Sequence, residues 1–226
     1  MEDTLFRKKG LDWLIPLLIF LILHDGCAWI CSFLIQNLTS ENSFWRENQI
    51  LLESAAGNTV TIPFLLYWIG KFPRNTAVSG KKSWIFWSIA VGICSCAIFN
   101  GILIGSGLTH LFENDYQQTT ETLYSGSMAV TILFVAVIAP ITEELLYRGI
   151  LYRTIRERRS FWGAALFSSL FFGIAHMAIV QGIYGFLTGM VLCYSYEHKR
   201  GIKSAVAVHM VMNLTSILIT QMSRMI

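Results

Sequence analysis

Charged side chains are scarce in this sequence of 226 residues: Asp, Glu, Lys and Arg make up 14 % of it, where ordinary soluble domains carry ~25 %. Hydrophobic residues reach 54 % before glycine is counted, and the mean hydropathy is +0.54. A soluble protein cannot bury so much apolar surface and still cover itself with polar groups. The composition excludes a cytosolic enzyme, a nucleic-acid-binding protein and a disordered chain. It predicts a membrane protein, with lipid as its first partner.

The cysteines form no disulfide framework. Their number is odd, five, and all of them lie inside apolar stretches. Neither a C-x-x-C pair nor the spacing of a zinc ribbon is present. We expect the cysteines to be small residues that help helices to pack.

Long hydrophobic runs, by contrast, are abundant. A membrane-spanning helix needs ~20 mostly apolar residues. The sequence has seven such runs: 11–36, 50–70, 83–108, 127–152, 160–178, 181–197 and 203–223. The fifth run is short, which predicts either a tilted neighbour or a helix that unwinds near His176 and Met177. The predicted fold is an all-α polytopic membrane helical bundle of about seven transmembrane helices.

Basic residues support this count independently. With a cytoplasmic N-terminus, the inside segments hold basic clusters such as 7–9 and 153–159, and the outside segments hold only Arg46 and Arg224. Lysine and arginine thus alternate from loop to loop, as the positive-inside rule requires. We predict a multi-pass protein of the cell membrane with its N-terminus in the cytoplasm.

The two halves of the sequence differ in their polar content. Residues 1–126 hold three generic spans, whereas most ionisable groups inside spans occur in residues 127–226. No repeat, low-complexity stretch or soluble domain interrupts the chain, so we expect one integrated membrane unit. Ionisable residues inside a membrane are costly and mark functional sites. They lie on three predicted helices, and the set to be explained is Glu143, Glu144, Arg148, His176, His209 and Asn213.

Helical spacing separates the roles of the two glutamates. Glu144 and Arg148 are four residues apart and can pair on one face, which predicts a structural ion pair. Glu143 is turned about 100° away and needs a partner from another helix, and as a desolvated carboxylate it suits a general base. Pro140 removes a backbone hydrogen bond and is expected to kink the helix beside Glu143. His209 and Asn213, also four residues apart, point into one space.

The predicted depths of these residues in the bilayer also agree with one another. The basic cluster 153–159 predicts that the fourth helix leaves the membrane near Tyr152, which places Glu143 ~14 Å deeper at 1.5 Å per residue. Glu143 and His176 lie at similar distances on either side of the turn near residues 158–160, so an antiparallel hairpin sets them level. His209 lies ~9 Å above Lys203 by the same measure. We predict one shared site in the cytoplasmic half of the bilayer.

These residues resemble the CPBP intramembrane proteases, a family of type II CAAX prenyl endopeptidases and bacteriocin-processing or immunity proteins. The family carries Glu-Glu-x-x-x-Arg, Phe-x-x-x-His and His-x-x-x-Asn motifs, each on its own transmembrane helix. All three are intact and in order here, and Phe186-x-x-Gly189 is similar to the glycine-containing helix between the last two. The resemblance covers about residues 127–215.

The resemblance implies roles for each residue. Glu143 and His176 would activate a water that attacks a peptide carbonyl, while His209 and Asn213 would stabilise the oxyanion. Glu144 and Arg148 would orient the helix. No cofactor is needed in this mechanism. In the family's alternative, a divalent metal such as Zn²⁺ is held by a glutamate and histidines, here Glu143, His176 and His209, although the sequence lacks His-Glu-x-x-His.

The expected substrate is a peptide or a membrane-anchored protein. The small size suggests a prokaryotic member, in which peptide or bacteriocin leader processing fits better than CAAX cleavage. Two other functions stay open: a non-catalytic bacteriocin immunity or scaffold protein with the same fold, and a small proton-coupled transporter. The absence of repeated broken helices weighs against the transporter.

Overall fold

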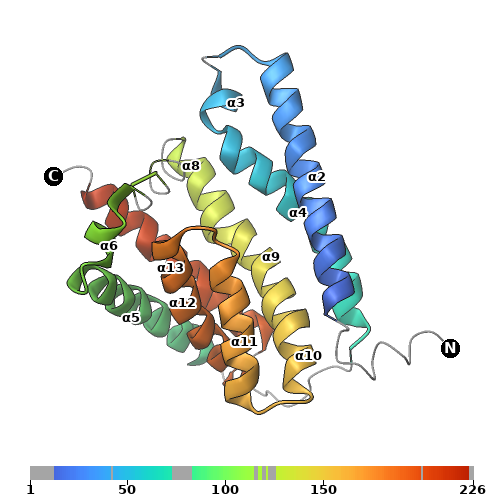
Figure 1. The fold of residues 1–226 in the computed structure, drawn as a ribbon, viewed down its shortest axis with the longest axis vertical. Coiled ribbons are helices and arrows are strands. Elements are labelled where there is room, and N and C mark those ends of the chain that lie inside the picture. Colours follow the sequence, from blue (N-terminus) through green and yellow to red (C-terminus); the bar gives the residue numbers. More distant parts are fainter. Residues whose placement is uncertain are drawn as a thin grey trace.

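The computed structural model describes residues 13–41, 43–72, 83–114, 117–118, 121, 126–199 and 201–223, and within these ranges every regular element is a helix. The chain is an all-α polytopic membrane bundle (Figure 1), as predicted. Its helices are α2 (Leu14–Leu38), α3 (Phe44–Glu47), α4 (Gln49–Gly70), α5 (Ser83–Gly105), α6 (Leu108–Leu111), α8 (Met128–Thr131), η1 (Ile132–Ile138), α9 (Ala139–Leu146), η2 (Tyr147–Tyr152), α10 (Arg153–Arg156), α11 (Phe161–Ile174), α12 (Ile179–His198) and α13 (Ile202–Ser223).

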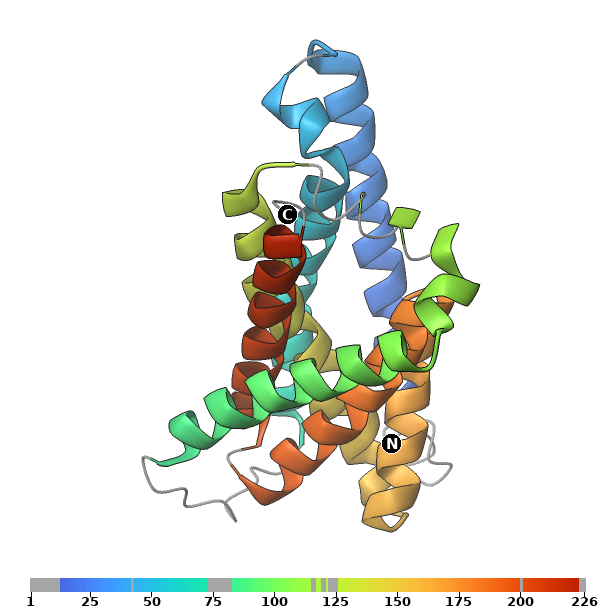
Figure 2. The same ribbon diagram turned by 90° about the vertical axis from the view of Figure 1, so that its left-hand side faces the viewer.

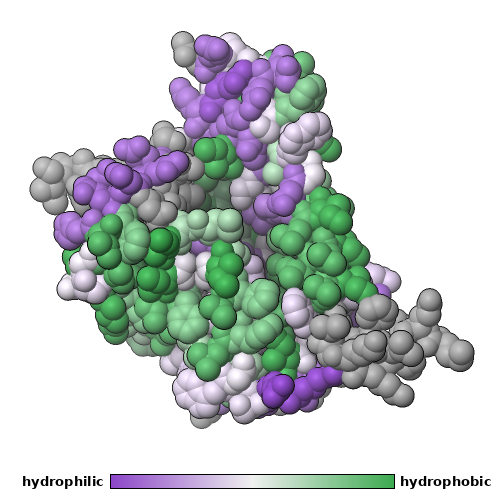
Figure 3. Space-filling model, in the orientation of Figure 1, coloured by the Kyte–Doolittle hydropathy of each residue, from purple (hydrophilic) through white to green (hydrophobic). Residues whose placement is uncertain are grey.

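Six of the helices in the described ranges are long and apolar enough to cross a membrane, and α11, with 14 residues, is apolar but shorter. Together they occupy the seven predicted runs. Hydrophobic residues cover the middle of the molecule and hydrophilic ones gather at its two ends (Figure 3). The count of seven crossings and the cytoplasmic N-terminus stay predictions, because the basic cluster 7–9 lies outside the described residues.

The short α11 ends as the sequence predicts. Its last residue is Ile174, and His176 and Met177 follow in a turn. Met177 has a positive φ of 55°, rare for a residue with a side chain. The chain therefore leaves the helix at His176, before α12 begins at Ile179.

One long helix lies at the centre of the bundle. Segments α8, η1, α9, η2 and α10 join into a single span, Met128–Arg156, whose η1 and η2 parts are π-helical. Helix α4 packs on one side of it and α13 on another, while α2 lies along α4. Helix α5 crosses α13 obliquely (Figure 2). Pro140 sits directly after η1 without ending the span.

Helices α11 and α12 form a tight hairpin beside the central helix. A Cβ placed on Gly173 of α11 would lie 2.5 Å from the carbonyl oxygen of Gly182 in α12, closer than real side chains come. Small residues of this kind let membrane helices approach closely enough to pack. The hairpin holds His176, at its turn, between Phe172 of α11 and Gly185 of α12.

Candidate active site

A cavity of about 280 Å³ lies among α4, the central helix, α11, α12 and α13. Glu143, His176, His209 and Asn213 all line it. The four residues named from the sequence as catalytic thus meet in one place, although they come from two helices and a turn. The convergence is confirmed by the structure, and their chemical roles stay predictions.

The predicted pair between Glu144 and Arg148 is confirmed. Arg148 Nη1 donates to Glu144 Oε1 at 2.8 Å, and both side chains are fully buried. Arg148 Nη2 also donates to the carbonyl of Gly189 in α12 at 3.3 Å. The pair therefore joins the central helix to α12 as well as balancing its own charge.

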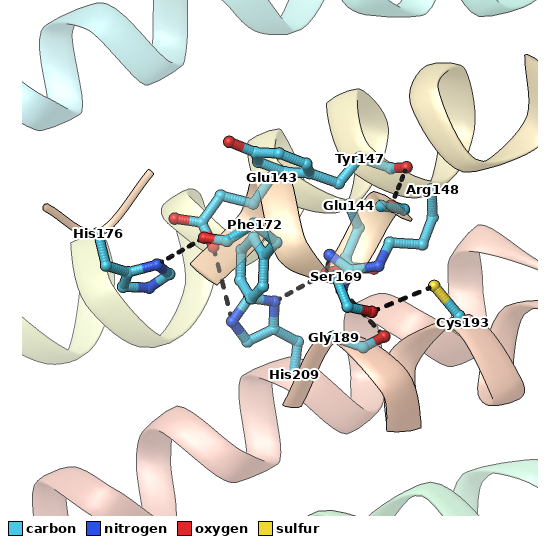
Figure 4. A network of polar contacts seen from close by, with 11 residues as sticks. Glu143, Glu144, Tyr147, Arg148, Ser169, Phe172, His176, Gly189, Cys193 and His209 are labelled. Atoms are coloured by element: carbon cyan, nitrogen blue, oxygen red, sulfur yellow. Dashed lines mark hydrogen bonds and ion pairs between the residues drawn. The ribbon is translucent and has the colours of Figure 1, made fainter. Parts of the chain in front are cut away.

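His209 lies between the two glutamates, a position that the sequence did not reveal. Its Nδ1 is 2.9 Å from Glu144 Oε1, and its Nε2 is 3.6 Å from Glu143 Oε2 (Figure 4). Because a carboxylate oxygen accepts, Nδ1–H donates to Glu144. Glu143, with its side chain 30 % exposed, keeps access to the cavity, whereas His209 is buried. The two adjacent glutamates thus have different surroundings: Glu144 is locked in a network and Glu143 faces open space.

Phe172 organises both histidines. Its ring makes edge-on contacts with His176, at 5.0 Å between centroids, and with His209, at 5.6 Å. Its carbonyl oxygen accepts from His176 Nδ1 at 2.8 Å, which assigns the ring proton to Nδ1 and leaves Nε2 as an acceptor. The guanidinium of Arg148 lies 4.6 Å over the same ring. The Phe-x-x-x-His motif is therefore a packing and orienting unit.

Pro140 explains the bond that Asn213 makes. At the end of η1 the N–H of Ala139 donates to Phe134, five residues earlier. In that register Val135 would pair with residue 140, but proline has no N–H. The carbonyl of Val135 accepts instead from Asn213 Nδ2 at 2.9 Å. One amide hydrogen of Asn213 thus closes a gap in the helix, and the amide has a second hydrogen for another acceptor.

Two walls of the cavity were not foreseen from the sequence. Ile50, Leu51 and Ser54 come from α4, a helix expected to be generic. Tyr184 and Thr188 come from α12. The only hint in the sequence was the polar content of these two spans, which indicates helices buried against neighbours. Which face they bury depends on helix rotation, and that was not predictable.

The cavity extends toward the end of the bundle that carries α3 and α8. Ile50 and Leu51 also line a second cavity of about 290 Å³ at that end, together with Arg46. Glu143 itself lies near the middle of the span Met128–Arg156. The predicted location in the cytoplasmic half of the bilayer stays a prediction, since no membrane is part of the structure.

The zinc alternative would need a set of ligands around one point. Within the described ranges, no three His, Cys, Asp or Glu side chains are grouped so that they could hold a metal ion. Glu143, His176 and His209 line one cavity without forming such a group. The arrangement does not fit a ready-made ligand set.

A comparison with protein families points to the same part of the chain. Residues 125–215 match the family model described as "Type II CAAX prenyl endopeptidase Rce1-like". A Bacillus subtilis (strain 168) protein named "Putative membrane peptidase YdiL" is 26 % identical over 155 residues, which are 66 % of this chain and 63 % of that protein. An "Uncharacterized 24.3 kDa protein" of Escherichia coli is 28 % identical over 160 residues, 65 % of this chain and 69 % of that protein.

No solved structure matches the chain significantly. The chain spans a little less than two thirds of the Bacillus relative. The family match nevertheless covers all three motifs, from Glu143 to Asn213, and its bounds agree with the region of resemblance found in the sequence. Over residues 125–215, this chain is therefore similar to the type II CAAX prenyl endopeptidases described by that family model, in the same region whose motifs resemble the CPBP proteases.

Proposed function

We propose that this chain is an intramembrane endopeptidase that cleaves membrane-associated peptides or membrane-anchored proteins with a water activated by Glu143 and His176. The observation that carries the proposal is the meeting of Glu143, His176, His209 and Asn213 around one cavity, within the residues that match the type II CAAX prenyl endopeptidase family model. A cavity at the centre of a membrane bundle also suits a substrate that arrives from the lipid.

The chemistry follows from the surroundings of each group. Glu143 is the carboxylate that faces the cavity, and His176 offers Nε2 as an acceptor because Nδ1 donates to Phe172. The water oxygen bonds to the scissile carbonyl carbon while Glu143 takes its proton, and the carbonyl π electrons move to oxygen. The C–N bond then breaks, and the amine nitrogen takes the proton from Glu143. Glu143 thus returns to its carboxylate form, and the peptide bond has become a carboxylic acid and an amine.

The oxyanion of the tetrahedral intermediate needs hydrogen-bond donors. Asn213 can offer the amide hydrogen that Val135 does not use, and His209, whose Nδ1–H donates to Glu144, would donate from Nε2 when the ring carries both protons. Glu144 and Arg148 act as positioning residues: they hold His209 through its Nδ1. Removing one donor of this kind typically costs ~10²–10³ in rate.

The test compares the parent protein with Glu143→Gln, which keeps size and hydrogen bonding but removes the base. Both are reconstituted in phospholipid vesicles with a mixture of synthetic membrane-inserting peptides, and mass spectrometry reads the products. We expect Glu143→Gln to melt like the parent and to cleave ~10²–10⁴ times more slowly, the usual contribution of a general base. Glu157→Gln, at an exposed position near the end of the same helix, is the matched control and should cleave normally.

Three results would redirect the proposal. Equal product patterns for the parent and Glu143→Gln, with both proteins folded, would favour the immunity or scaffold protein over the enzyme. Elemental analysis of active, detergent-purified protein addresses zinc: near one metal per chain, lost with activity on chelation, would replace the water mechanism by the metal mechanism. Substrate-dependent proton flux into the same vesicles would favour the transporter.

A further inference from the structure

Thr188 of α12 stands out among the buried threonines of the helices. Three others, Thr61, Thr142 and Thr154, donate their hydroxyls to a carbonyl four residues earlier at 2.8–3.2 Å, and the half-buried Thr215 does the same at 2.8 Å. This is the habitual bond of threonine inside a helix. Thr188 is only 2 % exposed, yet its Oγ1 has no hydrogen-bond partner among the described residues. A buried hydroxyl in that state is unfavourable, so it needs a partner that is not part of the folded chain.

The position of Thr188 indicates what that partner is. Thr188 lines the same cavity as Glu143 and Asn213. On α12 it lies between two residues that contact the site: Gly185, where an added Cβ would be 3.1 Å from the ring of His176, and Gly189, whose carbonyl accepts from Arg148. The hydroxyl thus belongs to the α12 side of the cavity that holds Glu143, within reach of a substrate bound there.

We propose that the Thr188 hydroxyl donates a hydrogen bond to the scissile carbonyl oxygen of the substrate, as a further oxyanion donor. This inference rests on the proposed peptidase function and deepens it. Asn213 donates one amide hydrogen to Val135, and His209 donates its Nδ1–H to Glu144. These two motif residues therefore have few hydrogens left to donate to an oxyanion. Thr188 is a donor that has no structural bond to break before it serves the substrate.

The experiment contrasts Thr188→Val with Thr154→Val, since both threonines are 2 % exposed and only Thr154 has a bond, to the carbonyl of Ile150. Valine keeps the shape and removes the hydroxyl. We expect Thr188→Val to lower kcat by ~10²–10³ with KM little changed, as for the loss of an oxyanion donor. Its melting temperature should not fall. Thr154→Val should keep kcat and melt ~2–4 °C lower, as expected for one lost hydrogen bond in a chain of this size.

Thr188→Ser supplies the rescue, because it restores the hydroxyl and should return kcat close to the parent value. Thr188→Ala replaces the valine variant if that one does not fold. Normal kcat in Thr188→Val, or a melting temperature that falls as in Thr154→Val, overturns the role of Thr188. The two proposals fail differently: if the parent cleaves no more than Glu143→Gln, the peptidase itself is wrong and the role of Thr188 falls with it.

Discussion

Helix α2 and the central helix are both long and strongly apolar, yet the protein covers them to different degrees. In the most hydrophobic stretch of each, 6 % of α2 is buried, against 39 % of the span Met128–Arg156. The difference follows from what each helix carries. The central helix bears Glu143, Glu144 and Arg148, and lipid rejects these groups unless other helices surround them. Helix α2 has mostly apolar side chains that lipid can solvate, such as the exposed Ile22 and Trp29.

The comparison teaches that hydropathy identifies a membrane helix but does not tell which helices it packs against. The buried polar residues decide that packing, since each of them needs a hydrogen-bond or ion-pair partner. Glu144, Arg148 and His209 join the central helix to α12 and α13 through short bonds. Helix α2 packs mainly along α4, and its links to neighbouring helices are less buried hydrogen bonds near its C-terminal end, from Gln49 to Ser32 and from Arg46 to the carbonyl of Gln36. Substitutions in the two regions should therefore differ in size.

The largest effect is expected for Arg148→Ala. Both members of the Arg148–Glu144 pair are fully buried, so the variant leaves a carboxylate without its cation. Breaking a buried pair in this way costs ~3–5 kcal/mol of stability. Thermal unfolding of the detergent-purified protein measures it, and Arg159→Ala, at an exposed position, is the control. A stable but inactive Arg148→Ala would instead place the arginine in contact with the substrate.

The ion pair also shows how far the sequence alone could lead. The pairing of Glu144 with Arg148 was predictable because residues four apart in a helix face each other. The seven apolar runs and the meeting of the motifs were predictable from desolvation cost and helix length. The bond between His209 and Glu144 was not, because it spans 65 residues and depends on how two helices rotate against each other.

Other parts of the site could not be predicted either, because they too depend on how the helices pack. The bond from Asn213 to Val135 depends on a π-helical segment before Pro140, and no local pattern announces that register. Thr188 and Ser54 reach the cavity only because of the way α12 and α4 pack. Local rules therefore predicted the elements and the motif residues, and tertiary packing supplied the remaining walls.

A smaller effect is expected for Gly189→Ala. A Cβ at this position would lie 2.7 Å from Cβ and 2.9 Å from Cα of Ser169, so backbone as well as side chain must move. Overpacking of this kind costs ~1–3 kcal/mol. Gly101→Ala in α5 is the matched control, because nothing lies within 4 Å of its added Cβ. It should be neutral or slightly stabilising, since alanine favours a helix over glycine by ~1 kcal/mol. Equal melting temperatures for the two variants would contradict the close packing of α11 on α12.

The smallest effect is expected in α2, at its one ion pair in the described part of the helix. Asp25 Oδ1 lies 3.0 Å from His24 Nδ1, and the Asp25 side chain is 73 % exposed. Asp25→Asn keeps the size and can keep a hydrogen bond to the histidine. An exposed pair contributes ~0–1 kcal/mol, so the melting temperature should hardly change. The matched variant Glu144→Gln, in the buried network, should melt much lower, because Arg148 loses its counter-charge.

This last comparison also tests whether the exposed face of α2 contacts lipid or a second protein. A carboxylate near the middle of a spanning helix is costly when lipid surrounds it. If Asp25→Asn lowered stability as much as Glu144→Gln, Asp25 would have to be buried against a partner in the membrane, and α2 would be an interface. Measuring both variants in detergent and in phospholipid nanodiscs separates the cases: if Asp25 faces lipid, Asp25→Asn should be neutral in detergent and neutral or stabilising in nanodiscs, whereas a buried partner makes it destabilising in both.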